Sequence, residues 1–293
     1  MKRSLVPISS LIIAALLVSQ CKKIDNARRE LRLSATVPAV DKTREAKILT
    51  AFFGLDNALP PTSRVMYRKA PGKDGMPLVF SLEVDPTTLD ASDFQVTTKN
   101  GSTFDVEAVT LLPAEEEYEL RTALLIGEYG NFPENPPILV TIVDELAGRT
   151  GASFKGVSAK VIPLEEGPVL SYAEYFTFTD DYPYVKEGAG CDCPKETTKM
   201  VVKTVWSGGV RALDGEELGN NERKAFEVTI VQGSDTVTVA PFRLADLGDN
   251  DNNIDLCLAE SGIPISVNVK ENTAIDPRDD KNLATSIEVV SRW

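Results

Sequence analysis

Short apolar runs separated by turn-forming residues constrain the fold of this 293-residue chain more than any other feature. Beyond the N-terminal segment, no long stretch shows the 3.6-residue period of an amphipathic helix. Apolar side chains instead alternate, as at Phe80, Leu82 and Val84. Runs of this kind, ending at Gly, Pro, Asn or Asp, are typical of an all-β sandwich or barrel. The strands expected are 47–55, 77–84, 94–98, 103–112, 122–129, 138–143, 153–163, 170–178, 200–206, 225–232, 235–242, 254–258, 264–269 and 286–290.

The expected strands fall into two groups. Residues 164–168 contain two acids, a Gly and a Pro, a composition typical of a boundary. Tight turns are expected within each group, at Asn100-Gly101 and at Gln232-Gly233. The pattern therefore predicts two tandem β-sandwich domains, 46–165 and 166–293, with one continuous larger β structure as the alternative.

The N-terminus has the features of an export signal. Lys2 and Arg3 precede the apolar segment 11–18, which is too short for a transmembrane helix. Ser19, Gln20 and Cys21 follow, and this arrangement resembles the lipobox of bacterial lipoproteins. The resemblance implies that residues 1–20 are a cleaved lipoprotein signal peptide, that Cys21 carries the lipid, and that residues 21–45 form a polar tether. The alternatives are an ordinary signal peptide with an incidental Cys, or an uncleaved anchor.

A short motif in the first group of strands points to a known type of domain. Asp85-Pro86 is followed by Asp93-Phe94-Gln95-Val96. This resembles the bacterial Ig-like domains of S-layer proteins, in which an Asp-Pro turn leads into such a strand. The resemblance implies an Ig-like β-sandwich that acts as a spacer or adhesive module on the cell envelope, without catalytic residues. The second domain resembles uncharacterised secreted bacterial proteins, which imply no activity.

Composition excludes several classes of function. The net charge of −13 argues against a nucleic-acid partner, because such proteins need a basic surface. The chain contains no histidine, which removes the commonest general base and metal ligand. The remaining catalytic possibility is a carboxylate-based hydrolase that uses Glu165-Glu166 or Glu216-Glu217. We expect no enzymatic activity.

Three cysteines remain if Cys21 is lipidated. Cys191 and Cys193 are too close in sequence to bond to each other without strain, so we expect one of them to form a disulfide with Cys257. The sequence leaves open which of the two pairs. A Cys-x-Cys metal or redox site is the less favoured alternative, since no histidine or second Cys pair accompanies it.

An acidic loop near the C-terminus is the candidate metal site. Its donors Asp249, Asp251, Asn253, Asp255 and Glu260 have the oxygen-donor spacing of an EF-hand loop. Ile254 stands where that loop needs Gly, and the flanks are expected to be strands. The two interpretations left open are therefore a weak Ca²⁺ loop in a β context and a solvated acidic turn.

An aromatic cluster offers a second candidate site. Tyr172, Tyr175, Tyr182 and Tyr184 lie close together in sequence and could stack on a ligand, although packing in the strand core and between the domains is the favoured explanation. The sequence thus predicts a non-catalytic, lipid-anchored structural or interaction module of the bacterial cell envelope, facing the periplasm or the cell surface. Its partners would be the membrane, through the lipid, and an envelope protein or glycan. The alternative is a lipoprotein that binds a glycan or peptide through these tyrosines, supported by Ca²⁺.

Overall fold

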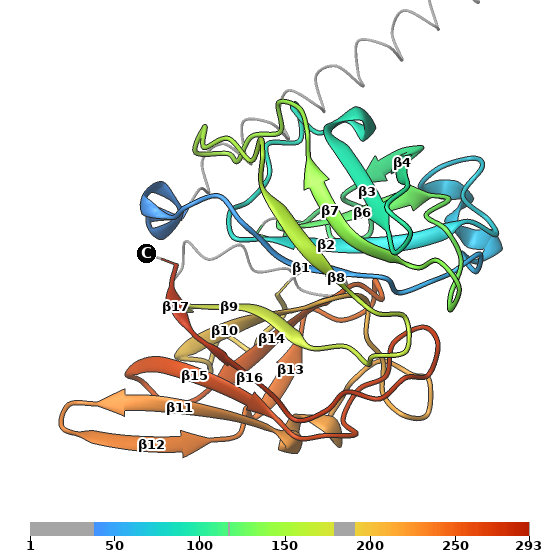
Figure 1. Ribbon diagram of the computed structural model, residues 1–293. Coiled ribbons are helices and arrows are strands. Elements are labelled where there is room, and N and C mark those ends of the chain that lie inside the picture. Colours follow the sequence, from blue (N-terminus) through green and yellow to red (C-terminus); the bar gives the residue numbers. More distant parts are fainter. Residues whose placement is uncertain (1–37, 117, 179–190, 293) are drawn as a thin grey trace, which may run out of the picture. The chain divides into compact units, whose positions relative to one another are not determined.

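Strands make up nearly all regular structure of the residues that the structure describes. The computed structural model describes residues 38–116, 118–178 and 191–292 (Figure 1). Within these ranges there is no α-helix, and no helix is long and apolar enough to cross a membrane. The only helical turns in them are the 3₁₀ segments Ala39–Thr43 (η1), Pro61–Val65 (η2), Ala91–Asp93 (η3) and Glu222–Ala225 (η4). The all-β class predicted from the sequence is confirmed.

The first half of the fold is one eight-stranded sheet in the order β4-β3-β7-β8-β1-β2-β6-β5. Strand β8 pairs antiparallel with β7 and parallel with β1, and so joins two antiparallel groups. Side chains of both groups meet in one N-terminal core, where the rings of Phe80 and Phe154 lie 5.0 Å apart. The strands are Ile48–Phe52 (β1), Asp74–Phe80 (β2), Phe94–Thr98 (β3), Thr103–Asp105 (β4), Ala108–Thr110 (β5), Thr122–Gly127 (β6), Pro137–Ile142 (β7) and Ser158–Ile162 (β8).

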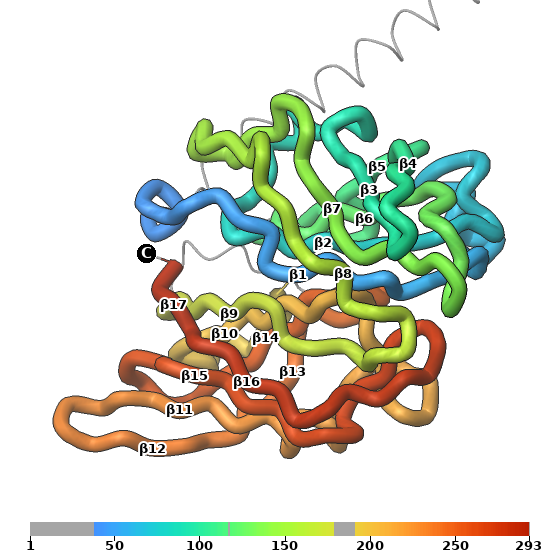
Figure 2. Tube along the Cα trace, in the orientation of Figure 1, coloured from blue at the N-terminus to red at the C-terminus, as the bar shows by residue number. Residues whose placement is uncertain are grey.

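The second half contains two sheets, ordered β13-β14-β10-β9-β17 and β12-β11-β15-β16. They enclose a C-terminal core in which Trp206 lies edge-on to Phe226. Figure 2 shows the last strand, β17, beside β9, with which it pairs in parallel. The strands are Leu170–Thr177 (β9), Met200–Trp206 (β10), Phe226–Gln232 (β11), Asp235–Val239 (β12), Arg243–Ala245 (β13), Asn253–Leu258 (β14), Ile263–Val269 (β15), Thr285–Glu288 (β16) and Val290–Ser291 (β17).

The five-stranded sheet is buried on both faces. Every residue of β10 and of β14 is buried. Successive side chains of a strand point to opposite faces, so β10 sends Val202 into the C-terminal core and its neighbour Val201 to the other face. Val205 on that second face packs with Val79 of β2 in the first half. The sheet therefore forms the layer between the two cores.

The expected strands agree with the observed ones in position, with local differences. Expected strands 94–98 and 200–206 match their observed limits, whereas 103–112 divides into β4 and β5 and the short β13 was not predicted. The last residue of the N-terminal core is Leu164, and the first residue of the C-terminal core is Leu170. Residues 38–293 nevertheless form one compact unit. This unit begins before residue 46 because Asp41, in the expected tether, is buried beside Arg121.

A buried carboxylate at the start of β2 predicts a pH dependence of stability. Asp74 accepts hydrogen bonds from the backbone N–H groups of Asn57 (2.7 Å) and Tyr129 (2.6 Å). Burial nonetheless raises its pKa to about 6. The folded chain thus binds this proton more tightly than the unfolded chain, so Asp74 loses stabilising effect as the pH rises from about 4 to above 6.

The Asp74→Asn variant tests this dependence because asparagine does not titrate. We expect the unfolding free energy of the variant to rise relative to wild type by about 1–3 kcal/mol between pH 4 and pH 7. Urea unfolding at several pH values measures the difference. The variant also lacks one of the two carboxylate acceptors, which lowers its unfolding free energy by the same amount at every pH. Plots of unfolding free energy against pH that run parallel for the two proteins would therefore contradict the prediction.

Candidate functional site

A row of three charged side chains crosses the face of the five-stranded sheet that points away from the C-terminal core. Lys203 of β10 lies opposite Glu174 of β9 and Asp255 of β14 in the strand registers. All three are at most 2% exposed. Buried charges persist only when they are paired, and the partners here come from both halves of the chain.

One end of this row belongs to an arginine cluster formed by Asp41, Glu83, Arg121, Glu174 and Arg292. Arg121 approaches Asp41 at 2.8 Å and Glu174 at 3.5 Å, and donates to the carbonyl of Ser81. Arg292, from the C-terminal end, donates to Glu83 at 2.8 Å and pairs closely with Glu174.

The charges of the arginine cluster compensate each other. Arg149 adds a third guanidinium, 2.7 Å from Glu83, so three arginines face three carboxylates. Burial by itself would raise the pKa of Glu174, but the guanidinium groups of Arg292 and Arg121 lower it below its usual range. The cluster is therefore an ionic connection between the two halves whose charges balance.

The other end of the row is a lysine cluster with an excess of negative charge. The ammonium of Lys203 lies 3.0 Å from Glu119, 2.6 Å from Asp246 and 3.4 Å from Asp255. Two further acids, Asp249 and Asp251, follow Asp246 in the loop between β13 and β14.

The pKa values of these carboxyls reflect their crowding. Burial, with a contribution from Asp246, raises the pKa of Asp249 to about 6. Burial and the neighbouring Asp249 raise the pKa of Asp251. Burial also raises the pKa of Glu119, against the opposing effect of Lys203. The loop thus holds more carboxylates than Lys203 can neutralise.

The predicted metal ligands do not form one set. Asp251 accepts bonds from the backbone N–H (2.7 Å) and the side-chain amide (2.6 Å) of Asn253, and its own N–H donates to Asp249 at 3.3 Å. Asp255, however, faces Lys203. Glu260 lies two residues beyond the end of β14, and a strand advances about 3.3 Å per residue, so the chain carries it away from the loop. The five residues do not surround one point as EF-hand ligands do, because the second half of the motif is the extended strand β14.

The structure shows which cysteine pairs with Cys257. Cys193 and Cys257 form the disulfide, with their Cα atoms 5.6 Å apart, and Cys191 lies buried in the same small apolar cluster. The bond connects β14 to the segment before β10, across a sequence separation of 64. It therefore closes a long loop within the second half.

Loss of this disulfide should destabilise the protein measurably. For a loop of this length we expect the double variant Cys193→Ala/Cys257→Ala to lose about 2–4 kcal/mol of unfolding free energy in urea. Dithiothreitol should lower the stability of wild type by a similar amount and leave the double variant unchanged. Equal stability of oxidised and reduced wild type would contradict the prediction.

The aromatic cluster is only partly within the described residues. Tyr172 is 4% exposed, donates its hydroxyl proton to Glu174 at 2.9 Å, and lies under the guanidinium of Arg121. It is therefore part of the interior and presents no stacking surface to a glycan. Tyr175 is half-buried and packs against the C-terminal core. Tyr182 and Tyr184 lie outside the described residues.

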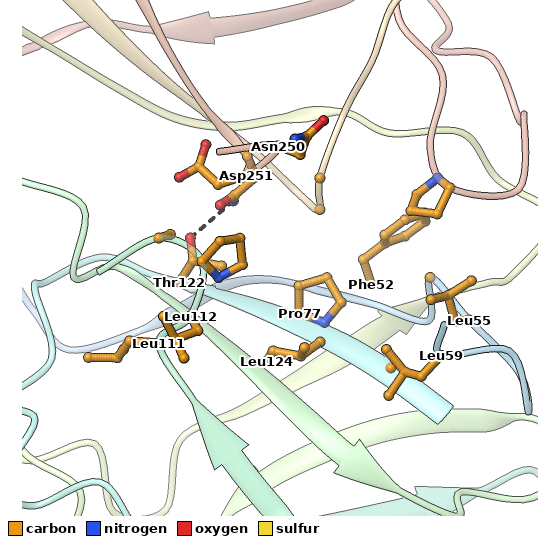
Figure 3. Close-up of a pocket in the computed structure, with 18 residues that line it drawn as sticks. Phe52, Leu55, Leu59, Pro77, Leu111, Leu112, Thr122, Leu124, Asn250 and Asp251 are labelled. Atoms are coloured by element: carbon orange, nitrogen blue, oxygen red, sulfur yellow. Dashed lines mark hydrogen bonds between the residues drawn. The ribbon is translucent and has the colours of Figure 1, made fainter. Parts of the chain in front are cut away.

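A mainly apolar cavity lies where loops of both halves meet strand β2 (Figure 3). Its volume is about 150 Å³, comparable to a cavity that holds benzene. Asn252 closes its polar side by donating to Thr122 at 3.0 Å. The remaining lining is mainly Phe52, Leu55, Leu59, Pro77, Leu111, Leu112 and Leu124. A space of this size fits one small apolar group, such as an aromatic ring.

The residues that hold the two halves together were not identified from the sequence. Lys203 interrupts the run Met-Val-Val-Lys-Thr-Val-Trp, and Glu174 and Asp255 likewise interrupt apolar runs. A single charge inside a strand that is otherwise apolar on both faces is the signal that could have identified them. Arg121 and Arg292 show no such signal, because Arg121 lies just before strand β6 and Arg292 just after strand β17.

Comparison with known proteins gives weak similarities. No protein-family model matches this sequence, and no curated protein does. Among solved structures, the chain is similar to the N-terminal part of the bacterial S-layer protein SbsC, with 12% identity, a TM-score of 0.28 and coverage of 84% of this chain and 44% of that one. It is also similar to the S-layer protein rSbsC(31-844), with 13% identity, a TM-score of 0.28 and coverage of 84% and 26%. The chain spans less than half the length of either protein, and similarity at this level transfers no function.

Proposed function

We propose that this protein is a non-catalytic, lipid-anchored module of the bacterial cell envelope with a structural or interaction role. The observation that carries the proposal is that its buried charged side chains pair with one another across the two halves of the fold. Arg121, Glu174 and Arg292 connect the two cores through ion pairs, and their charges are compensated inside the protein. Such an arrangement supports a mechanical or spacer role, since these groups are engaged in holding the fold.

The N-terminal sequence supports the anchoring part of the proposal. Cys21 follows the apolar segment 11–18 and precedes Pro38, where the compact unit begins. Removal of residues 1–20 takes two positive charges from a chain of net charge −13. The mature protein would be repelled by anionic lipid surfaces, so membrane attachment would depend on the acyl chains. An envelope protein or glycan is the proposed partner of the exposed surface.

Expression of the full-length chain in a bacterial host tests the anchor. We expect the product to partition into the detergent phase of a Triton X-114 separation, and mass spectrometry to show a mature N-terminus at Cys21 with added acyl mass. The Cys21→Ser variant should enter the aqueous phase, whereas the control Ser19→Ala, which keeps the cysteine, should behave as wild type. A mature chain that starts elsewhere, or wild type in the aqueous phase, refutes the anchor.

A further inference from the structure

Three carboxylates from two distant segments converge beside the lysine cluster. Glu116 and Glu119 precede β6 in the first half, and Asp249 belongs to the β13–β14 loop of the second half. One oxygen from each side chain lies within 4.8 Å of the other two. Oxygen ligands of one Ca²⁺ ion, each about 2.3–2.6 Å from it, lie at most about 5 Å from one another, so these three oxygens fit a single coordination shell.

Unused acceptors next to this group also point to a cation. Asp246 and Asn253 are 2% and 0% exposed, and the Oδ1 atom of each finds no hydrogen-bond donor among the described residues. Both line a cavity of about 10 Å³ together with Asp249, and that volume suits a single water molecule or ion. The Nδ2 of Asn253 donates to Asp251, which fixes the amide orientation and leaves its carbonyl oxygen as an acceptor.

The charge balance at this place favours a bound cation. Glu116, Glu119, Asp246, Asp249 and Asp251 contribute five carboxylates, and Lys203 contributes one ammonium. The buried oxygens Oε2 of Glu116 and Oδ2 of Asp249 also find no donor among the described residues. Like charges this close repel one another strongly, and a divalent ion would remove much of that cost.

We infer that the protein binds one Ca²⁺ ion through Glu116, Glu119 and Asp249, with Asp246 completing the negative side of the site. The ion connects the segment before β6 to the β13–β14 loop and so ties the two halves together at a second place. Ca²⁺ accepts irregular oxygen shells such as one built from two loops, whereas Mg²⁺ demands a near-ideal octahedron at 2.0–2.1 Å. The nearby ammonium of Lys203 opposes binding, so the dissociation constant lies at about 10⁻⁴–10⁻³ M.

Titration of the full-length protein in detergent with CaCl₂ tests the inference. We expect calorimetry to show one saturable Ca²⁺ ion per chain. The melting temperature should rise by about 3–5 °C at ten times the dissociation constant and return when EDTA is added. No saturable binding up to about 10 mM overturns the inference, and equal or tighter binding of Mg²⁺ overturns the assignment to Ca²⁺.

Variants locate the ion. Asp249→Asn and Glu116→Gln preserve shape, and each should weaken Ca²⁺ binding at least tenfold. Asp249→Asn should also raise the melting temperature in EDTA, because it removes repulsion; a residue with a purely structural role would lower it. Glu260→Gln is the matched control: it should bind as wild type here, but it would lose affinity if the loop 249–260 bound the ion like an EF-hand. Wild-type affinity in both Asp249→Asn and Glu116→Gln overturns the site.

Discussion

Replacement of Arg121 by methionine is expected to lower the free energy of unfolding by about 3–5 kcal/mol. The guanidinium is 1% exposed, lies 2.8 Å from Asp41, and covers the ring of Tyr172 at 4.2 Å. Methionine fills much of the volume but leaves Asp41 buried without its cation. Because removing one partner exposes the full desolvation cost of the other, the loss should far exceed that of a surface ion pair. Urea unfolding followed by circular dichroism measures it.

Lys155→Met provides the matched control for Arg121→Met. Lys155 also pairs with two acids, Asp144 at 3.4 Å and Glu145 at 2.8 Å, but it is 49% exposed. An exposed pair contributes about 0–1 kcal/mol, so this variant should remain close to wild type. A loss of less than about 1 kcal/mol for Arg121→Met would show that the arginine cluster does not hold the fold together.

Lys203→Met should produce a comparable or larger loss, at the upper end of about 3–5 kcal/mol. Its ammonium is the cation shared by Glu119, Asp246 and Asp255, and all four side chains are at most 2% exposed. Removal of the lysine leaves three carboxylates that repel one another in the interior. Thermal and urea unfolding of the purified variant give the size of the effect.

A compensating change separates charge from packing at Lys203. Asp246→Asn removes one of the three carboxylates that are left without a cation. The double variant Lys203→Met/Asp246→Asn should therefore regain part of the unfolding free energy that Lys203→Met loses. Lys270→Met is the surface control, since Lys270 is 62% exposed and pairs with Glu227 at 3.3 Å. If the double variant is less stable than Lys203→Met by the full effect of Asp246→Asn alone, the two groups are not coupled and the prediction fails.

Local patterns predicted most of the strands because they depend on neighbours in sequence. The hairpin turn at Gln232-Gly233 joins β11 to β12 as expected, and the observed limits of β3 and β10 match those of the expected strands. The acidic loop shows where such reasoning stops. Asp249 and Asp251 were identified, but the spacing suggested Asp255 and Glu260 as their partners, whereas the fold brings Glu119 and Lys203 to this loop.

The sequence by itself determined the all-β class and the positions of most strands. These follow from periodicity, turn residues and the order of segments, each readable within a few positions. Only the tertiary structure decided which charges are buried and what neutralises them. Arg292 meets Glu83 across 209 positions of sequence, and Arg121 meets Asp41 across 80. Pairs so distant depend on how the sheets pack against each other, because a buried ion pair forms only where packing brings both charges to the same place.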